Sequence, residues 1–249
     1  MKKVVGIIGG MGPLATADLF EKIILHTEAR TDQEHLRVVI DSNTDIPDRT
    51  EALLHGGEDP VPELAKSAVR LESIGAQVLV MPCNTAHGFY DQIAAAVNVP
   101  VLNMITLTRD ALKEKGIRRA GLLATDGTVE TGIYQNAFAG SGIELLVPEG
   151  EDQKAVMDIV YDGVKAGRSD FDASAFRRTC EHLLAAGAET LVLGCTELPP
   201  AFADYHLDYP CVDPTLELAL GAIRAAGGTV RLQDAGSILQ GKKEHLWKK

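Results

Sequence analysis

An internal duplication constrains the fold of this chain more than any other feature of its sequence. Three segments of the first half recur in order in the second half, at offsets of 115, 112 and 110 residues: VVGIIGGMGPLAT (4–16) with RAGLLATDGTVET (119–131), SIGAQVLVMPC (73–83) with AAGAETLVLGC (185–195), and VPVLN (99–103) with YPCVD (209–213). This spacing is too long for a solenoid repeat of about 20–50 residues. The chain is therefore predicted to contain two copies of one structural unit.

Each copy alternates short β-branched, apolar runs with segments of helical periodicity. The runs at 2–8, 36–42, 77–83 and 99–105 predict strands, and apolar spacing predicts helices over 16–30 and 63–76. Such alternation is typical of a parallel sheet covered by helices on both faces. We therefore predict an α/β fold of two similar lobes, each a parallel sheet flanked by helices. Pseudo-two-fold symmetry would relate the lobes and place a site in the cleft between them.

The duplication also predicts where the lobes divide. The first lobe is expected to span residues 1–105 and the second residues 106–214. A further helical pattern over 215–228 lies beyond the second repeat, so the segment 215–249 is a candidate to cross back and complete the first lobe. The basic residues at 241–249 carry no functional interpretation.

The charge of the chain limits its partners. Its 249 residues include 35 acidic and 24 basic side chains, a formal net charge of −11. Nucleic acids and anionic membranes bind basic surfaces, so neither is an expected partner. No apolar run approaches the roughly 18 residues of a membrane span. Gly6, Gly9 and Gly10 interrupt the N-terminal apolar run, which therefore favours a strand over a signal peptide. The expected location is accordingly the cytoplasm.

The four cysteines divide into two kinds. None forms a C-x-x-C pair, which argues against a structural metal site and favours free thiols. Cys180 lies in a helical run and Cys211 in a predicted strand, so both are expected in the core. Cys83 and Cys195 occupy the same point of the two repeats, each just after a buried strand and before polar residues. Parallel sheets carry their sites at such strand ends, so the two thiols are predicted to face each other across the cleft.

Two opposed thiols suit the removal of a proton from one face of a carbon and its return from the other, without a cofactor. A cysteine hydrolase would use one cysteine with a histidine base such as His87, and would leave the second cysteine unexplained. A non-catalytic small-molecule sensor is a further alternative. So is dinucleotide binding, because residues 10–15 fit G-x-G-x-x-A, but Asp41 comes late for that motif and the second repeat lacks it.

Four motifs resemble the cofactor-independent aspartate/glutamate racemase family: GIIGGMGPLAT (6–16), NTDIPDRT (43–50), MPCNTAH (81–87) and LVLGCTELP (191–199). IGGMGP and CTELP are similar to its aspartate racemase branch. The resemblance implies an isomerase that interconverts L- and D-aspartate without a cofactor, with Cys83 and Cys195 as the two catalytic bases. It also implies a homodimer. The alternatives within the superfamily are a broad-specificity aspartate/glutamate racemase and a related isomerase or decarboxylase.

An acidic protein needs local donors to bind a dicarboxylic amino acid. Strand-to-helix turns and their hydroxyl or amide side chains are the first candidates for substrate binding: Asn84, Thr85, Thr125, Thr196 and Glu197. Glu197 could instead hold the substrate ammonium or orient the Cys195 thiol. Arg49 could pair with a carboxylate or, as a surface residue, with Asp48. The resemblance favours the substrate for Arg49 and places Lys165 near the substrate. Met11 and Asn43, which is expected to close the same pocket, are further candidate substrate-binding residues.

Overall fold

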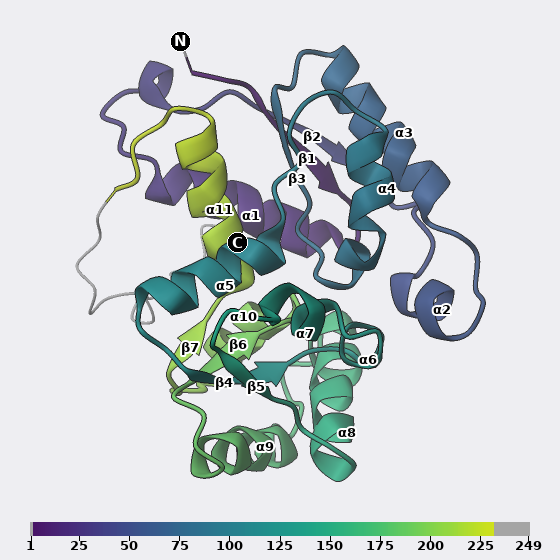
Figure 1. Ribbon diagram of the computed structural model, residues 1–249, viewed down its shortest axis with the longest axis vertical. Coiled ribbons are helices and arrows are strands. Elements are labelled where there is room, and N and C mark those ends of the chain that lie inside the picture. Colours follow the sequence, from purple (N-terminus) through teal and green to yellow (C-terminus); the bar gives the residue numbers. More distant parts are fainter. Residues whose placement is uncertain (1, 232–249) are drawn as a thin grey trace.

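Two lobes, each built on a parallel sheet, make up the computed structural model, which describes residues 2–231 (Figure 1). The sheet of the first lobe has the order β2-β1-β3, and that of the second lobe β5-β4-β6-β7. The predicted two-lobed α/β fold is therefore confirmed. The strands are β1 (Val5–Gly9), β2 (Val38–Ser42), β3 (Val78–Val80), β4 (Arg119–Leu123), β5 (Glu144–Leu146), β6 (Thr190–Leu193) and β7 (Cys211–Val212).

Helices connect the strands and cover both sheets. In the first half of the chain they are α1 (Pro13–His26), α2 (Arg49–Leu54), α3 (Val61–Ser73), α4 (Tyr90–Ala95) and α5 (Met104–Glu114), with 3₁₀ turns η1 (Asp32–Glu34) and η2 (Thr85–Phe89). In the second half they are α6 (Asp126–Glu130), α7 (Ile133–Phe138), α8 (Glu151–Asp158), the π-helix η3 (Ile159–Lys165), α9 (Ser174–Ala185), α10 (Leu198–Asp204) and α11 (Pro214–Ala225).

The duplication is visible in local geometry as well as in the order of the strands. Gly75 and Gly187 follow α3 and α9 with φ of +98° and +100°, the left-handed conformation that commonly ends a helix. Asn103 and Asp213 both cap the helix that follows them, because each side chain accepts hydrogen bonds from backbone N–H groups of the first turn. Residues at equivalent positions of the two repeats thus perform the same structural task.

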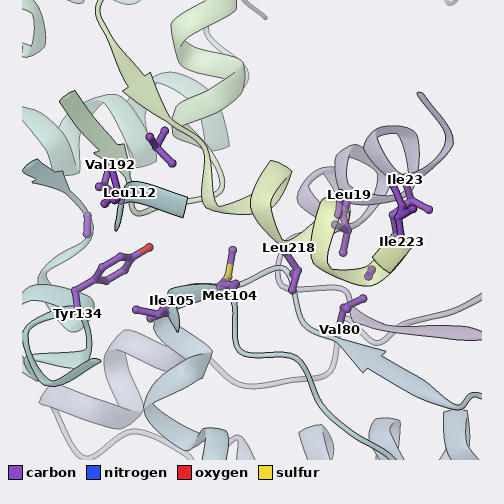
Figure 2. Packing of buried hydrophobic residues seen from close by; sticks show 14 of the residues in the cluster. Leu19, Ile23, Val80, Met104, Ile105, Leu112, Tyr134, Val192, Leu218 and Ile223 are labelled. Carbon is purple, nitrogen blue, oxygen red and sulfur yellow. The ribbon is translucent and has the colours of Figure 1, made fainter. Parts of the chain in front are cut away.

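The two capped helices, α5 and α11, join the lobes. They pack against each other, while α11 also packs on α1 of the first lobe and α5 on α7 of the second. The apolar side chains between these helices form one continuous core that reaches both sheets (Figure 2). It includes Leu19, Ile23, Val80, Ile105, Leu112, Tyr134, Val192, Leu218 and Ile223. Each lobe has a second apolar cluster on the other face of its sheet.

Two predicted elements differ from those observed by more than a few residues or in kind. The strand predicted over 99–105 is reduced to a parallel bridge between Leu79 and Val101, because the Asn103 cap starts α5 at Met104. The helix predicted over 16–30 runs instead from Pro13 to His26, because Thr27 leaves it for an antiparallel bridge with Val230.

The division of the chain after residue 105 stays a prediction. That boundary falls within α5, which packs against α11 and against α7 of the second lobe. The part of the predicted segment 215–249 beyond residue 231, including the basic residues 241–249, lies outside the described residues.

Candidate active site

A cavity lies between the lobes, where residues that follow β1, β3, β4 and β6 converge. The space among its lining residues, open solvent included, is about 350 Å³. All the residues predicted for the site line it except Asn43. Its lining is Met11, Asp48, Arg49, Thr50, Cys83, Asn84, Thr85, Thr125, Tyr161, Lys165, Cys195, Thr196 and Glu197.

The Cys195 thiol is paired with a carboxylate. Cys195 follows β6, is only 7% exposed, and its Sγ donates a hydrogen bond to Glu197 Oε2 at 2.9 Å. Burial raises the pKa of Cys195 well above its ordinary value, and the negative charge of Glu197 and the hydrogen bond to it raise it further. This thiol is therefore held in its protonated form, with a proton acceptor already in contact.

The surroundings of Cys83 are different. Cys83 follows β3, is 6% exposed, and lies beside the Arg49 guanidinium. Burial alone would lower the pKa of Arg49, but the charge of Cys83 and its hydrogen bond with Arg49, together with Asp48, raise it. The two thiols, equivalent in the sequence, thus face opposite charges in the cavity.

His87 fixes the turn that carries Cys83. Its Nε2 accepts a hydrogen bond from the Met104 N–H at 3.1 Å, so Nδ1 carries the proton and donates to the Cys83 carbonyl oxygen at 2.8 Å. Burial lowers the pKa of His87 to about 4, so the ring is neutral. Both ring nitrogens are engaged with the backbone, which leaves no free nitrogen to act as the base of a cysteine hydrolase.

Two cations reach the cavity from opposite lobes. Arg49 begins α2, and its guanidinium is fixed by hydrogen bonds to the carbonyls of Pro47 at 3.0 Å and Met11 at 3.3 Å. Lys165 ends the π-helix η3 and keeps an exposed side chain, with Nζ 4.1 Å from the Tyr161 ring centroid. Burial would lower the pKa of Lys165, but the negative charge of Glu197 and further neighbours raises it. Both cations are positioned for an anionic ligand.

Three hydroxyls tie the lobes together at the floor of the site. Thr85 Oγ1 lies 3.1 Å from Thr125 Oγ1 and 3.0 Å from Thr128 Oγ1, and the last two are 3.3 Å apart. All three side chains are buried. Because Thr85 belongs to the first lobe and its two partners to the second, this triangle links the turn after Cys83 to the turn between β4 and α6.

Two buried donors in the lining lack a protein acceptor. Within residues 2–231, Arg49 Nε and Asn84 Nδ2 have no hydrogen-bond partner. A buried polar group without a partner is costly, and most such groups in proteins are satisfied. Their presence in one cavity points to a ligand with acceptor oxygens.

Asn43 was predicted near the substrate but lies outside the lining. Its side-chain amide donates instead to Ser67 Oγ at 3.2 Å and to Glu63 Oε2 at 3.3 Å, both on α3. Its backbone packs on Gly10, where a Cβ would come within 2.2 Å of the Asn43 carbonyl oxygen. Gly10 is therefore required by loop packing and by its φ of +96°, which accounts for part of the glycine-rich motif without a dinucleotide.

Three lining residues were not predicted as site residues: Asp48, Thr50 and Tyr161. Asp48 caps α2, and its Oδ1 accepts from the N–H groups of Thr50 at 2.8 Å and Glu51 at 3.0 Å. Tyr161 precedes Lys165 by four residues in the run VYDGVK, which was the one available signal. Thr50 approaches Gly127 of the other lobe, a contact that no local pattern encodes.

Residues 2–231 contain no group of three or more His, Cys, Asp or Glu side chains arranged to hold a metal ion. Across the same range, none of the helices has the length and apolar character needed to span a membrane.

Comparison with known proteins places this fold and cavity in a family. A model described as Asp/Glu/hydantoin racemase matches residues 8–220. The chain belongs to this racemase family, and it is accordingly an isomerase.

Several relatives cover most of the chain. It is similar to an aspartate racemase of Picrophilus torridus, with 36% identity and a TM-score of 0.79 over 92% of this chain and 96% of that one. An aspartate racemase homologue from Pyrococcus horikoshii gives 26% identity and a TM-score of 0.74 over 91% and 100% of the two chains. A broad-specificity amino-acid racemase of Bacillus subtilis is 25% identical over 88% of this chain and 96% of its own length.

Proposed function

We propose that this enzyme interconverts L- and D-aspartate by transferring protons between the substrate α-carbon and two cysteine thiols, without a cofactor. The observation that carries the proposal is the cavity itself. Cys83 and Cys195 reach it from equivalent positions of the two lobes, and Arg49 and Lys165 supply two cations for the two carboxylates of the substrate. The similar structures include an aspartate racemase and an aspartate racemase homologue, which support this choice of substrate.

The proposed reaction uses the different surroundings of the two thiols. In one direction the Cys83 thiolate removes the α-proton, and the electron pair of the C–H bond moves into the adjacent carboxylate. The Cys195 thiol then donates its proton to the opposite face of the same carbon, which leaves Cys83 protonated and Cys195 as a thiolate. Arg49 stabilises the charge that develops on the carboxylate, and the buried Asn84 amide binds the same carboxylate throughout the reaction. The reverse direction exchanges the two roles.

The cavity supports a dicarboxylic rather than a monocarboxylic amino acid. Arg49 and the donors of the turn after Cys83 suit one carboxylate, and Lys165, at the rim, suits the other. Glu197 is the anion in contact with a thiol, and it can also hold the substrate ammonium. Such charge-assisted bonds are stronger than neutral ones, so local contacts can outweigh the net charge of −11.

A broader specificity is the second candidate. The Bacillus relative is described as a broad-specificity amino-acid racemase, and its similarity extends over nearly its whole length. Glutamate is longer than aspartate by one methylene, a difference that pocket shape discriminates by only about 1–3 kcal/mol. Glutamate is therefore the first alternative substrate to test beside aspartate.

Chiral chromatography of single enantiomers of aspartate, glutamate and neutral amino acids after incubation with the enzyme tests the proposal. Aspartate should racemise fastest, and Cys83→Ser or Cys195→Ser should slow it about a thousandfold, as expected when a catalytic acid or base is lost. Cys211→Ser is the matched control, because this half-buried thiol lies outside the cavity. Substantial racemisation by both active-site variants would refute the two-thiol mechanism, and rapid turnover of neutral amino acids would favour the broader specificity.

We further propose a cytoplasmic homodimer. All four cysteines are free thiols, as is usual in reducing compartments. The outer face of α1 exposes Leu14, Ile24 and Leu25, and exposed apolar groups of this kind often form protein interfaces. Light scattering after gel filtration should give twice the mass of the chain, and a monomer at micromolar concentration would contradict the dimer.

A further inference from the structure

A tyrosine of the second lobe holds an amide of the first lobe beside Cys83. Tyr134 lies on α7, is completely buried, and belongs to the central core with Ile105 and Leu112 (Figure 2). Its hydroxyl donates a hydrogen bond of 2.6 Å to Asn84 Oδ1. Tyr134 itself does not line the cavity.

Asn84 is the residue that this hydrogen bond orients. It follows Cys83 directly, is 2% exposed, and lines the cavity. Its Oδ1 is occupied by Tyr134, whereas Nδ2 is buried and has no partner among the residues that the structure describes. The amide oxygen therefore has a hydrogen-bond partner in the protein, whereas the amide nitrogen is a buried donor without an acceptor, which is energetically costly.

We propose that Tyr134 is a positioning residue, which fixes the Asn84 amide so that Nδ2 rather than Oδ1 meets a carboxylate of the substrate. The inference rests on the proposed function, since it needs an anionic ligand in the cavity. The two ends of an asparagine amide are nearly equal in size, so shape alone does not choose between them. A reversed amide would direct its oxygen at the carboxylate and replace an attraction with a repulsion.

The chemistry of the phenol suits this task. Burial raises the pKa of Tyr134 far above its ordinary value, so the hydroxyl keeps its proton and remains a donor at any working pH. Its ring is fixed by the core and by Phe138, with ring centroids 5.7 Å apart. A rigid donor selects the oxygen end of the amide, whereas a mobile one would let the amide turn.

The hydrogen bond from a buried tyrosine to an asparagine amide is present on the Cys83 side of the site only. At the offset of 115 residues, the first repeat has Leu19 in place of Tyr134, and the counterpart of Asn84 is Thr196, whose hydroxyl donates to Glu197 Oε2 at 3.3 Å. The carboxylate that Asn84 meets is therefore bound on the Cys83 side. The duplication has kept both thiols but has given only one of them an oriented amide.

Steady-state kinetics of Tyr134→Phe, Asn84→Ala and the double variant test the inference. Tyr134→Phe should raise KM for aspartate about fivefold to tenfold with kcat within about twofold, as expected for lost binding that is equal in the ground and transition states. Asn84→Ala should raise KM at least as much. In the double variant, loss of the Tyr134 hydroxyl should cause no further rise, because it acts only through Asn84. Tyr209→Phe, which removes a hydroxyl bonded to Glu181 far from the cavity, is the control.

Calorimetric titration with succinate, a dicarboxylate without an α-amino group, separates binding from catalysis. The affinity should fall in Tyr134→Phe and Asn84→Ala, and also in Asn84→Asp, which can accept from Tyr134 but lacks Nδ2. Asn84→Asp keeps the test decisive if Tyr134→Phe fails to fold. Two results would overturn this inference alone, provided that the wild type racemises aspartate. One is an unchanged KM and succinate affinity in Tyr134→Phe, and the other is wild-type succinate affinity in Asn84→Asp. A wild-type enzyme that neither racemises nor binds dicarboxylates would overturn the proposed function as well.

Discussion

The two cavity thiols show how single residues made a duplicated site asymmetric. The residue two positions after each cysteine is Thr85 in the first repeat and Glu197 in the second. Thr85 bonds to hydroxyls of the other lobe, whereas Glu197 accepts from the Cys195 thiol. Cys83 faces Arg49 instead. Identical thiols placed at equivalent strand ends therefore differ in the charge beside them, which is what a proton donor and a proton acceptor require.

This asymmetry predicts a change in pH dependence when Glu197 is neutralised. Burial, Glu197 and the hydrogen bond to it all raise the pKa of Cys195, so this thiol stays protonated to high pH and activity falls only when it loses its proton. Glu197→Gln removes the charge and should lower that pKa. The alkaline limb of the kcat/KM profile, measured with the enantiomer that Cys83 deprotonates, should move to lower pH. Glu144→Gln, an exposed carboxylate outside the cavity, is the control, and an unmoved limb would contradict the role of Glu197.

The site residues that the sequence predicts are those that repeat or match a motif. Cys83 and Cys195 mark the same position of two copies, and Arg49 lies in a recognisable loop. Tyr161 and Thr50 escape prediction because their place in the cavity depends on a π-helix and on the approach of the two lobes. Asn43 stays a predicted site residue, but it does not line the cavity, and its side chain bonds to Ser67 on α3.

At the scale of elements, the positions of most strands and helix ends follow from local sequence. The packing partners of α5 and α11 do not. Glycine at 75 and 187 ends a helix in each repeat, and the strand runs at 36–42 and 77–83 are observed in shortened form. The packing of α5 against α11 and α7, and of α11 against α1, depends on which apolar faces meet, and periodicity alone does not encode the partner. The Asn103 cap also shows why the strand predicted at 99–105 fails: a good cap begins a helix inside an apolar run.

The equivalent caps of α5 and α11 should differ in their contribution to stability. Asn103→Ala removes a cap whose Oδ1 accepts from two N–H groups at 3.0 and 3.1 Å, and should cost about 1 kcal/mol of unfolding free energy. Asp213 caps α11 and also pairs with Lys22 Nζ at 2.7 Å, where both side chains are about 15% exposed. Asp213→Ala should therefore cost more, about 2 kcal/mol, because the ion pair is lost with the cap while Lys22 keeps Asp18 as a partner.

Urea denaturation followed by circular dichroism measures both variants. Asp213→Asn is the informative control, because an asparagine can retain the cap but not the charge, so its loss should lie between the other two. Equal losses for Asn103→Ala and Asp213→Ala would show that the ion pair between α1 and α11 adds nothing to the cap.

At the scale of the whole molecule, the shared core and the threonine triangle connect the two lobes that carry the thiols. The lobes are joined by α5 and α11 on one side and by Thr85, Thr125 and Thr128 at the site. The net charge of −11 acts against binding an anion, so the cavity must concentrate its donors locally, as Arg49, Lys165 and Asn84 do. The duplication in the sequence predicts two lobes, but only their packing brings the two thiols into one cavity.

Racemisation of L-aspartate in deuterium oxide tests the central claim most directly. If two thiols exchange protons with the substrate, the D-aspartate formed should carry one deuterium at the α-carbon, because the proton on the donating thiol comes from solvent. Mass spectrometry combined with chiral separation measures this. Cys83→Ser and Cys195→Ser should each abolish formation of deuterated D-aspartate, whereas Cys211→Ser should not. D-aspartate that retains its original α-proton, or deuterated D-aspartate formed at the wild-type rate by either active-site variant, would contradict the two-thiol mechanism.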